Sequence, residues 1–347
     1  MARCAVPVAE RSVRRRKESR RPFDLPPGEL LAFARGDGAA RHPYQYRPPL
    51  FLFARPRFLP SFPVPSNYRL VQLASGAHSV HSLAHRETFH PVIGPVLEAE
   101  ALYVKQLRLR ERLQNHAGEF VIWDVGLGAA ANALTVLRST SGIPAAVRMV
   151  SFDCTPEPLE FSLQNAAALG YFGGYEDHLQ ELLRTRRVRF QNGRQTVDWE
   201  LHLADFPTLL TQPEAKHFPQ PHAILFDAFS PAKNPQMWTP QLFTNLFNLL
   251  DPARPCALPT YSRSTMLRVT LLLAGFYVGV GHATGEKEET TLAANSLTLL
   301  DEPLPVKWLE RARISYSAEP MWDAVYRQAP LTPESWAKLQ AHPQFRL

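Results

Sequence analysis

The stretch "EFVIWDVGLGAAANALTVLR", residues 119–138, decides the fold class of this chain. Its first part is an apolar run that ends in an acid, which is typical of a buried strand. Gly126 and Gly128 then form a turn, and the alanine- and leucine-containing segment behind them favours a helix. A strand that passes through a glycine turn into a helix is the opening unit of an α/β domain.

The same alternation continues to about residue 300. We expect strands at 146–153, 222–227, 255–261, 276–282 and 290–300, helices at 156–170, 239–250 and 264–275, and a hairpin at 188–205 that turns at Asn192-Gly193. Strands that alternate with helices predict a parallel, doubly wound sheet. The last two strands are joined only by "ATGEKEE", which is too short for a crossover helix, so they should be antiparallel. We therefore predict a Rossmann-like class I methyltransferase fold, with a mostly parallel seven-stranded sheet and a terminal antiparallel hairpin.

The bulk composition indicates a soluble cytoplasmic protein. The three cysteines, Cys4, Cys154 and Cys256, form neither a disulfide framework nor a metal-ligand spacing. The longest apolar run, at residues 269–280, is too short to span a bilayer, and no secretory signal pattern is present at the N-terminus. We expect no metal and no membrane partner.

Positive charge is concentrated at the N-terminus. Residues 1–70 carry 14 Lys and Arg against 5 Asp and Glu, whereas the remaining 277 residues carry 24 against 27. We divide the chain into a basic, Pro/Arg-rich extension (1–66), a catalytic domain (67–305) and a C-terminal extension (306–347). The run "RSVRRRKESRR" suits contact with nucleic acid. The alternatives are a solvated tail, a segment upstream of the true start codon, or an Arg-rich transit peptide.

Four acids stand where predicted strands end: Asp124, Asp153, Asp205 and Asp227. Ligands of open α/β sheets bind beyond the carboxyl ends of the strands, so the set favours a ligand site over isolated helix N-caps. Asp153 is placed to accept the ribose hydroxyls of an adenosine cofactor, and Asp205 to meet the adenine amino group. The glycine turn at Gly126 and Gly128 lets the backbone approach such a ligand closely.

The loop "FDAFSPAKNPQMW", residues 226–238, is the predicted acceptor side of the site. Methyl transfer from a sulfonium is a direct displacement, so the enzyme must present a free lone pair in line with the methyl group. Asp227 is placed to orient an amine and to take its proton. Phe229, Pro231 and Trp238 would form an apolar wall that excludes water or stacks a base. The structural alternative is a proline-stiffened turn before a capped helix.

Several segments resemble a known family. "DAFSPAKNPQMWT" (227–239) and "TYSRSTMLRVTLLLAGF" (260–276) are similar to the methyltransferase domain of the tRNA 5-methylaminomethyl-2-thiouridine biosynthesis (MnmC-type) proteins. "GPVLEAEALYV" (94–104) resembles a glycine- and glutamate-bearing segment of that family, and "TGEKEETTLA" (284–293) its closing hairpin. The resemblance covers about residues 67–300.

The resemblance implies an S-adenosyl-L-methionine (SAM)-dependent N-methyltransferase that acts on tRNA. The acceptor would be the 5-aminomethyl group of the wobble (2-thio)uridine, which becomes 5-methylaminomethyl(-2-thio)uridine. The residues implied at the cofactor are Glu100, Asp124, Gly126, Gly128, Asn132, Asp153 and Asp205. The residues implied at the substrate mouth are Asp227, Phe229 and Lys233, of which Lys233 would contact an RNA phosphate or would be an ordinary surface lysine.

Two departures from the family pattern bear on function. The cofactor loop reads "GLGAAAN" where the family commonly has G-x-G-T-G-x-N, so Ala130 replaces the third glycine while Asn132 remains. No second G-x-G-x-x-G follows the predicted fold, so we expect no flavin-dependent oxidase, and a separate enzyme would have to supply the aminomethyl group. The basic extension is a candidate tRNA anchor.

Two other readings of the site stay open. An aminopropyltransferase of the spermidine-synthase type shares the fold and uses decarboxylated SAM, but such enzymes tend to surround a cationic substrate with acids, whereas "SPAKNPQ" has a lysine. A non-catalytic RNA-binding protein on the same fold is supported only by the altered glycine loop. Binding of SAM, of decarboxylated SAM, or of neither discriminates the three.

Overall fold

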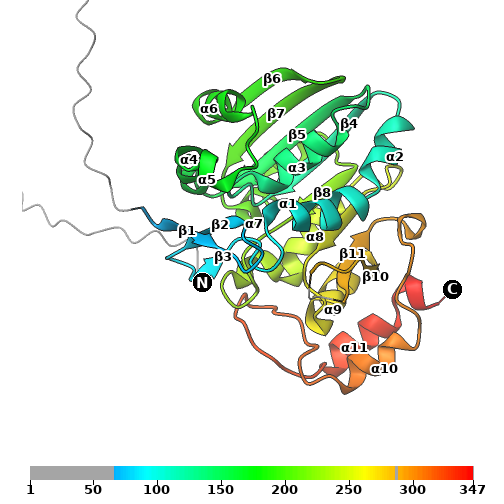
Figure 1. Cartoon of the computed structure of the whole chain (residues 1–347). Helices are drawn as coiled ribbons and strands as arrows, with labels where there is room; N and C mark the ends of the chain where they lie inside the picture. The colour runs from blue at the N-terminus through cyan, green and yellow to red at the C-terminus, as the bar shows by residue number, and fades with distance from the viewer. Residues whose placement is uncertain (1–65, 286–287, 347) are drawn as a thin grey trace, which may run out of the picture. The chain divides into compact units, whose positions relative to one another are not determined.

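The computed structural model describes residues 66–285 and 288–346 (Figure 1). All but the last residue of the predicted basic extension (1–66) therefore lies outside the described residues.

An eight-stranded sheet forms the centre of the described chain, in the order β10-β11-β9-β8-β4-β5-β7-β6. Its strands are β4 (Glu119–Val125), β5 (Ala146–Asp153), β6 (Arg187–Asn192), β7 (Gln195–Leu203), β8 (Ala223–Phe226), β9 (Ala257–Thr260), β10 (Tyr277–Gly281) and β11 (Thr290–Ala294). The five strands from β9 to β7 run parallel, and β6, β11 and β10 are each antiparallel to a neighbour. The predicted fold class is confirmed, with one strand more than the predicted seven.

Both hairpins form, although one turn differs from the prediction. β10 and β11 pair antiparallel as expected, and β11 lies between β10 and β9. In the other hairpin Asn192 pairs with Gln195, so the two-residue turn is Gly193-Arg194 rather than Asn192-Gly193. Gly193 has a φ of 60°, and a Cβ there would lie 2.6 Å from the carbonyl oxygen of Ser141. Close approach, in addition to turn geometry, therefore requires this glycine.

Helices cover both faces of the sheet because the inner strands bury side chains on both sides. Along β4, Phe120 and Ile122 join one apolar cluster, whereas Val121, Trp123 and Val125 join the other. The first face carries α1 (Pro95–Ala99), the π-helix η1 (Glu100–Lys105), α2 (Leu109–Gln114), α3 (Ala131–Thr140), α4 (Glu157–Gln164), α5 (Ala166–Leu169) and α6 (Glu176–Thr185). The second face carries α7 (Phe206–Leu209), α8 (Pro240–Leu249), α9 (Thr265–Leu273), α10 (Trp308–Ile314) and α11 (Pro333–Gln340).

The helix predicted at 156–170 is interrupted. Asn165 has a φ of −115°, and its side chain donates to the carbonyl of Phe161 at 2.8 Å, which separates α4 from α5. The predicted stop at Gly170 is confirmed, since Gly170 has a φ of 71°. Four short 3₁₀ helices, η2 (Pro213–His217), η3 (Pro235–Trp238), η4 (Leu297–Leu299) and η5 (Pro343–Phe345), complete the described elements.

A second, three-stranded sheet precedes the main sheet in the chain and was not predicted. It consists of β1 (Tyr68–Gln72), β2 (His78–Ser82) and β3 (Glu87–Thr88), paired antiparallel in that order. Tyr68 packs edge-on against Phe89 and tilted against Phe161 of α4. This small sheet is thereby attached to the helices near the carboxyl ends of the main strands.

The segment after residue 306 packs against the second face of the main sheet. Trp308, Ala312, Leu339 and Phe345 are buried in the apolar cluster of that face. Trp308 and Ala312 belong to the helix α10. The Gln344 side chain donates to the carbonyls of Val278 (2.7 Å) and Leu304 (3.0 Å) and accepts from the Val278 amide (2.8 Å), so it binds the edge strand β10.

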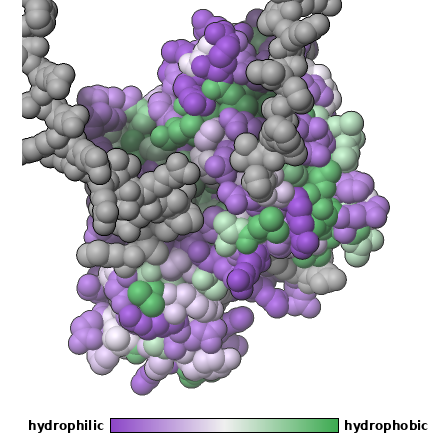
Figure 2. Space-filling view, turned by 90° about the vertical axis from the view of Figure 1, so that its left-hand side faces the viewer, coloured by the Kyte–Doolittle hydropathy of each residue, from purple (hydrophilic) through white to green (hydrophobic). Residues whose placement is uncertain are grey.

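None of the helices in residues 66–285 and 288–346 is long and apolar enough to cross a bilayer. On the face drawn in Figure 2, hydrophilic side chains cover much of the described surface and apolar groups form patches between them.

We expect Gln344→Ala to lower the free energy of unfolding by about 2 kcal/mol, because the buried amide of Val278 loses its acceptor. The matched control is Gln340→Ala on the exposed side of α11, which should change stability by less than about 0.5 kcal/mol. Urea unfolding measures both. Equal effects of the two substitutions would show that Gln344 does not hold the edge strand.

Candidate active site

A cavity of about 400 Å³ opens at the carboxyl ends of the central strands. It is lined by residues that follow β4, β5, β7 and β8 and by the segment after β3. β4 lies between β8 and β5 in the sheet, so the strand order reverses at this point. Ligands of open α/β sheets bind at such a reversal, as the sequence predicted.

The glycine turn forms the floor of the cavity. Gly126 has a φ of 89°, and a Cβ on it would lie 2.7 Å from the backbone oxygen of Asp227. Gly128 has a φ of 53°, and its N–H donates to Asp153 at 2.8 Å. A Cβ on Gly128 would lie 3.2 Å from the ring of Phe89. Both glycines are therefore required by backbone shape and by close neighbours.

Ala130, the residue at which the loop departs from the family pattern, adopts the backbone conformation that glycine prefers. It is fully buried, has φ 60° and ψ 12°, and is the N-cap of α3. A left-handed backbone costs a residue with a Cβ about 1–2 kcal/mol. The loop thus keeps its shape without the third glycine, at the expense of local strain.

Asp124 lies beneath the cavity rather than on its wall. Its carboxylate is 1% exposed and accepts a hydrogen bond from Ser151 at 2.8 Å. Burial raises the pKa of Asp124 to about 7; Ser151 opposes the rise, and the nearby Asp227 and Asp153 add to it. Asp124 is therefore not among the residues that line the cavity.

Asp153 and Asp205 both line the cavity. Asp153 accepts from the amides of Gly128 (2.8 Å) and Thr155 (3.3 Å). Burial raises the pKa of Asp153, and these backbone donors oppose the rise. Asp205 is also the N-cap of α7, accepting from the Thr208 amide at 3.2 Å. Asp205 therefore caps α7 and lines the cavity at the same time.

Asp227 and Asn132 meet at the centre of the cavity wall. The side-chain amide of Asn132 donates to Asp227 at 2.7 Å, which joins the start of α3 to the end of β8. The two residues are 95 positions apart in the sequence. Asn132 thereby orients the carboxylate at which an amine is expected to bind.

The apolar wall of the acceptor loop differs from the prediction. Phe229 lines the cavity, together with Met237 and Tyr261. Trp238 is fully buried instead and packs against Phe226, while its indole N–H donates to the carbonyl of Phe229 at 2.8 Å. Trp238 is therefore a core residue that holds the loop, and Pro231 is not among the lining residues.

Two other predicted residues lie outside the cavity lining. Glu100 accepts from Ser139 at 2.6 Å and from Arg110 at 3.1 Å on the first helical face. Glu98, two positions earlier, lines the cavity in its place. Lys233 is exposed beside the mouth of the cavity. Burial lowers the pKa of His85, and the nearby positive charge of Lys233 lowers it further.

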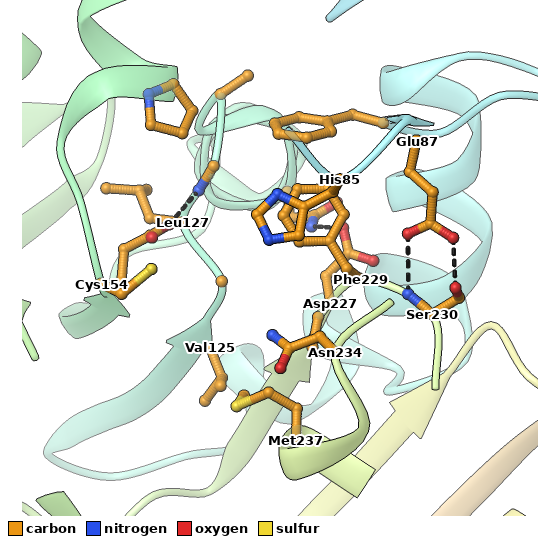
Figure 3. Close-up of a pocket in the computed structure, with 18 of the residues that line it drawn as sticks. His85, Glu87, Val125, Leu127, Cys154, Asp227, Phe229, Ser230, Asn234 and Met237 are labelled. Carbon is orange, nitrogen blue, oxygen red and sulfur yellow. Dashed lines mark hydrogen bonds between the residues drawn. The ribbon is translucent and has the colours of Figure 1, made fainter. Parts of the chain in front are cut away.

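The small sheet supplies a set of residues that the sequence reasoning missed, and Figure 3 shows several of them around the acceptor loop. Glu87 accepts from the amide of Ser230 at 3.0 Å and from its hydroxyl. His85 stacks on Phe229 with ring centres 4.0 Å apart. The sequence signal that could have identified this segment as part of the site is its dense run of polar and aromatic residues, "AHRETFH" (84–90).

Comparison with known proteins agrees with this geometry. Residues 173–296 match the model of a family described as S-adenosyl-L-methionine-dependent methyltransferase. Two tRNA 5-methylaminomethyl-2-thiouridine biosynthesis bifunctional proteins MnmC are similar in sequence. The one from Aeromonas hydrophila is 30% identical over 204 residues, 55% of this chain and 30% of that protein. The one from Pseudomonas putida (strain W619) is 27% identical over 247 residues, 67% of this chain and 35% of that protein.

The fold comparison points the same way. The crystal structure of MnmC2 from Aquifex aeolicus aligns with a TM-score of 0.57 and 21% identity, over 80% of this chain and 86% of that one. The described domain is thus similar to the MnmC proteins in sequence and to MnmC2 in fold, and residues 173–296 match the SAM-dependent methyltransferase family. The chain spans about a third of the length of the MnmC proteins it matches.

The cofactor of the matched family is SAM, and the charge of the residues that line the cavity fits it. The acids that line the cavity are Glu87, Glu98, Asp153, Asp205 and Asp227. Among the described lining residues no lysine is present, and the one arginine, Arg86, is exposed. This charge suits a sulfonium and an adenosine better than a pyrophosphate. No cluster of metal-ligating side chains occurs in the described part of the chain.

We expect Ala130→Gly to raise the free energy of unfolding by about 0.5–1 kcal/mol, because relief of left-handed strain exceeds the entropy that glycine loses. The matched control is Ala133→Gly within α3, which should lower stability by about 1 kcal/mol. Urea unfolding of both variants measures the difference. Loss of stability in both would mean that residue 130 is not strained.

We expect Asp124→Asn to remove a pH dependence of stability. The folded-state pKa of about 7 lies above the usual 3.8, so the folded protein holds this proton more tightly and loses stability as pH rises between those values. Relative to wild type, the variant should gain about 2–4 kcal/mol between pH 4 and pH 8. Urea unfolding across that range measures it, and a difference that stays constant with pH would contradict the assignment.

Proposed function

We propose that this MnmC-type domain transfers a methyl group from SAM to the 5-aminomethyl group of the wobble (2-thio)uridine in tRNA. The observation that carries the proposal is the position of Asp227. Its carboxylate shares one cavity with Asp153 and is oriented by Asn132 at 2.7 Å. An acid for the cofactor ribose and an acid for an acceptor amine thus lie in the same pocket.

The chain's own residues account for the positioning that this reaction needs. Bound SAM supplies an electrophilic methyl group. Asp153 accepts from the ribose hydroxyls, and Asp205 lies where it can meet the adenine amino group. Asp227 accepts a hydrogen bond from the amine and so directs the remaining lone pair toward the methyl group. Phe229 and Tyr261 exclude water from that point.

The tRNA substrate is supported by the relatives and by the charge of the chain. The MnmC proteins are named for tRNA 5-methylaminomethyl-2-thiouridine biosynthesis. The basic N-terminal segment and the exposed Lys233 suit an RNA backbone. A separate enzyme that releases a free aminomethyl group on the uridine would act before this one, and we place the reaction in the cytoplasm.

One observation favours an aminopropyltransferase as the second candidate. The small sheet brings Glu87 to the cavity and helix α1 brings Glu98, which makes the cavity more acidic than the loop sequence suggested. Glu87, however, is already bonded to the amide and hydroxyl of Ser230 and so fixes the loop. Calorimetry decides: the proposal expects SAM to bind more tightly than decarboxylated SAM, and the aminopropyltransferase expects the reverse. An RNA-binding protein without catalysis would bind neither.

The decisive test is methyl transfer from labelled SAM to tRNA from cells that lack the modification, followed by mass analysis of the nucleosides. We expect one methyl group on 5-aminomethyl(-2-thio)uridine. Asp227→Asn should lower kcat by about 100-fold or more, with SAM affinity largely kept, because the amine loses its proton acceptor. Asp177→Asn, on the exposed side of α6, is the matched control and should leave the rate unchanged. SAM binding without transfer to any tRNA would refute the substrate.

A further inference from the structure

His90 lies between two carboxylates on the wall of the cavity. Its Nε2 is 3.4 Å from Asp227, and its Nδ1 is 3.8 Å from Glu98. The side chains of His90 and Glu98 are each 8% exposed, and that of Asp227 is 19% exposed. An imidazole whose two nitrogens both face buried carboxylates is favoured in its doubly protonated, cationic form.

The backbone at His90 is held in an uncommon conformation. Its φ is 48°, in the left-handed region, which non-glycine residues adopt mainly where surrounding structure imposes it. The residue follows β3, whose Glu87 is bonded to the acceptor loop. The small sheet and the acceptor loop together therefore fix the ring beside Asp227.

Several acids lie near His90. Besides Asp227 and Glu98, Glu87 lines the same cavity, and the buried Asp124 is close enough to Asp227 for that carboxylate to raise its pKa. Burial raises the pKa values of Tyr103 and Tyr261, and the nearby Asp227 and Glu98 raise both further. Of the other basic side chains that line the cavity, Arg86 is exposed and His85 is stacked on Phe229.

An acceptor amine bound only by carboxylates would keep its proton, because opposite charges favour the ammonium form. The ammonium has no lone pair and cannot attack. A fixed cation beside Asp227 reverses this preference by lowering the pKa of the bound amine.

We propose that His90 is a positioning residue that acts through Asp227 and Glu98 to keep the bound acceptor amine unprotonated. This inference rests on the proposed function. The ammonium R–NH₃⁺ passes one proton through Asp227 to solvent, and its lone pair forms the N–C bond as the C–S bond of the sulfonium breaks. The products are the secondary ammonium R–NH₂⁺–CH₃ and the neutral thioether, so one proton is released per turnover.

The test is the pH dependence of kcat/KM for tRNA methylation in wild type and His90→Asn. Asparagine tolerates the left-handed backbone and carries no charge. In His90→Asn, we expect the rise of kcat/KM on the acidic side of the pH profile (the acid limb) to move to higher pH by about one unit. This shift lowers kcat/KM about tenfold at pH 7 and leaves near wild-type rates at alkaline pH. His81→Asn, on β2 and bonded to Thr88, is the matched histidine control and should leave the limb in place.

A double variant separates charge from packing. His90→Asn with Glu98→Gln removes one cation and one anion, so the acid limb should return toward its wild-type position. A fall in rate that is the same at every pH, or a double variant worse than His90→Asn at every pH, would overturn the proposal.

The protonation of His90 gives a readout that does not depend on activity. In nitrogen-15 NMR of histidine-labelled protein, we expect the His90 ring to be doubly protonated at pH 7 in wild type and to lose a proton at lower pH in Asp227→Asn. A neutral His90 ring at pH 7 refutes this inference whatever the substrate is. Wild-type protein that methylates no amine refutes the proposed function instead.

Discussion

The contact between Gly126 and the backbone of Asp227 is the constraint on which the site depends. A Cβ on residue 126 would stand 2.7 Å from the Asp227 oxygen, and the Asp227 amide donates to Val125 at 3.0 Å. The loop after β4 and the loop after β8 can approach this closely only because one of them lacks a side chain. Cofactor and acceptor must be in contact for a direct displacement, and this approach brings their two loops together.

The small sheet turns this contact into an enclosed pocket. Phe89 lies over Gly128, and Glu87 binds Ser230, so one segment covers both the cofactor loop and the acceptor loop. His85 adds its ring to Phe229. Water exclusion strengthens every electrostatic interaction inside such a site. Residues 85–90 therefore line the cavity together with the loops that follow the main strands.

The sequence predicted the strands and helices in which apolar residues recur at a regular spacing. Long apolar strands and capped helices such as α8, with Thr239 as N-cap, appear where expected. The small sheet was not predicted because its strands are short and partly polar. They show no alternation of apolar and polar residues, which is the usual sequence signal of a strand. Glu100 was placed at the cofactor, but Glu98 and Glu100 stand two positions apart on successive helical segments and so point in different directions. Glu100 bonds to Ser139, and Glu98 lines the cavity.

The buried acids explain why such a site costs stability when it holds no ligand. Asp124 and Asp153 have raised pKa values because burial penalises their charge, and Asp227 and Glu98 share one histidine. A sulfonium would bring a further positive charge to this site, so its binding would offset part of the repulsion among the carboxylates. Two residues near the cavity, Ala130 in the glycine loop and His90 after β3, also have a left-handed backbone. We expect the buried acids and the strained backbone to lower the stability of the free protein, as is common where a fold trades stability for catalysis.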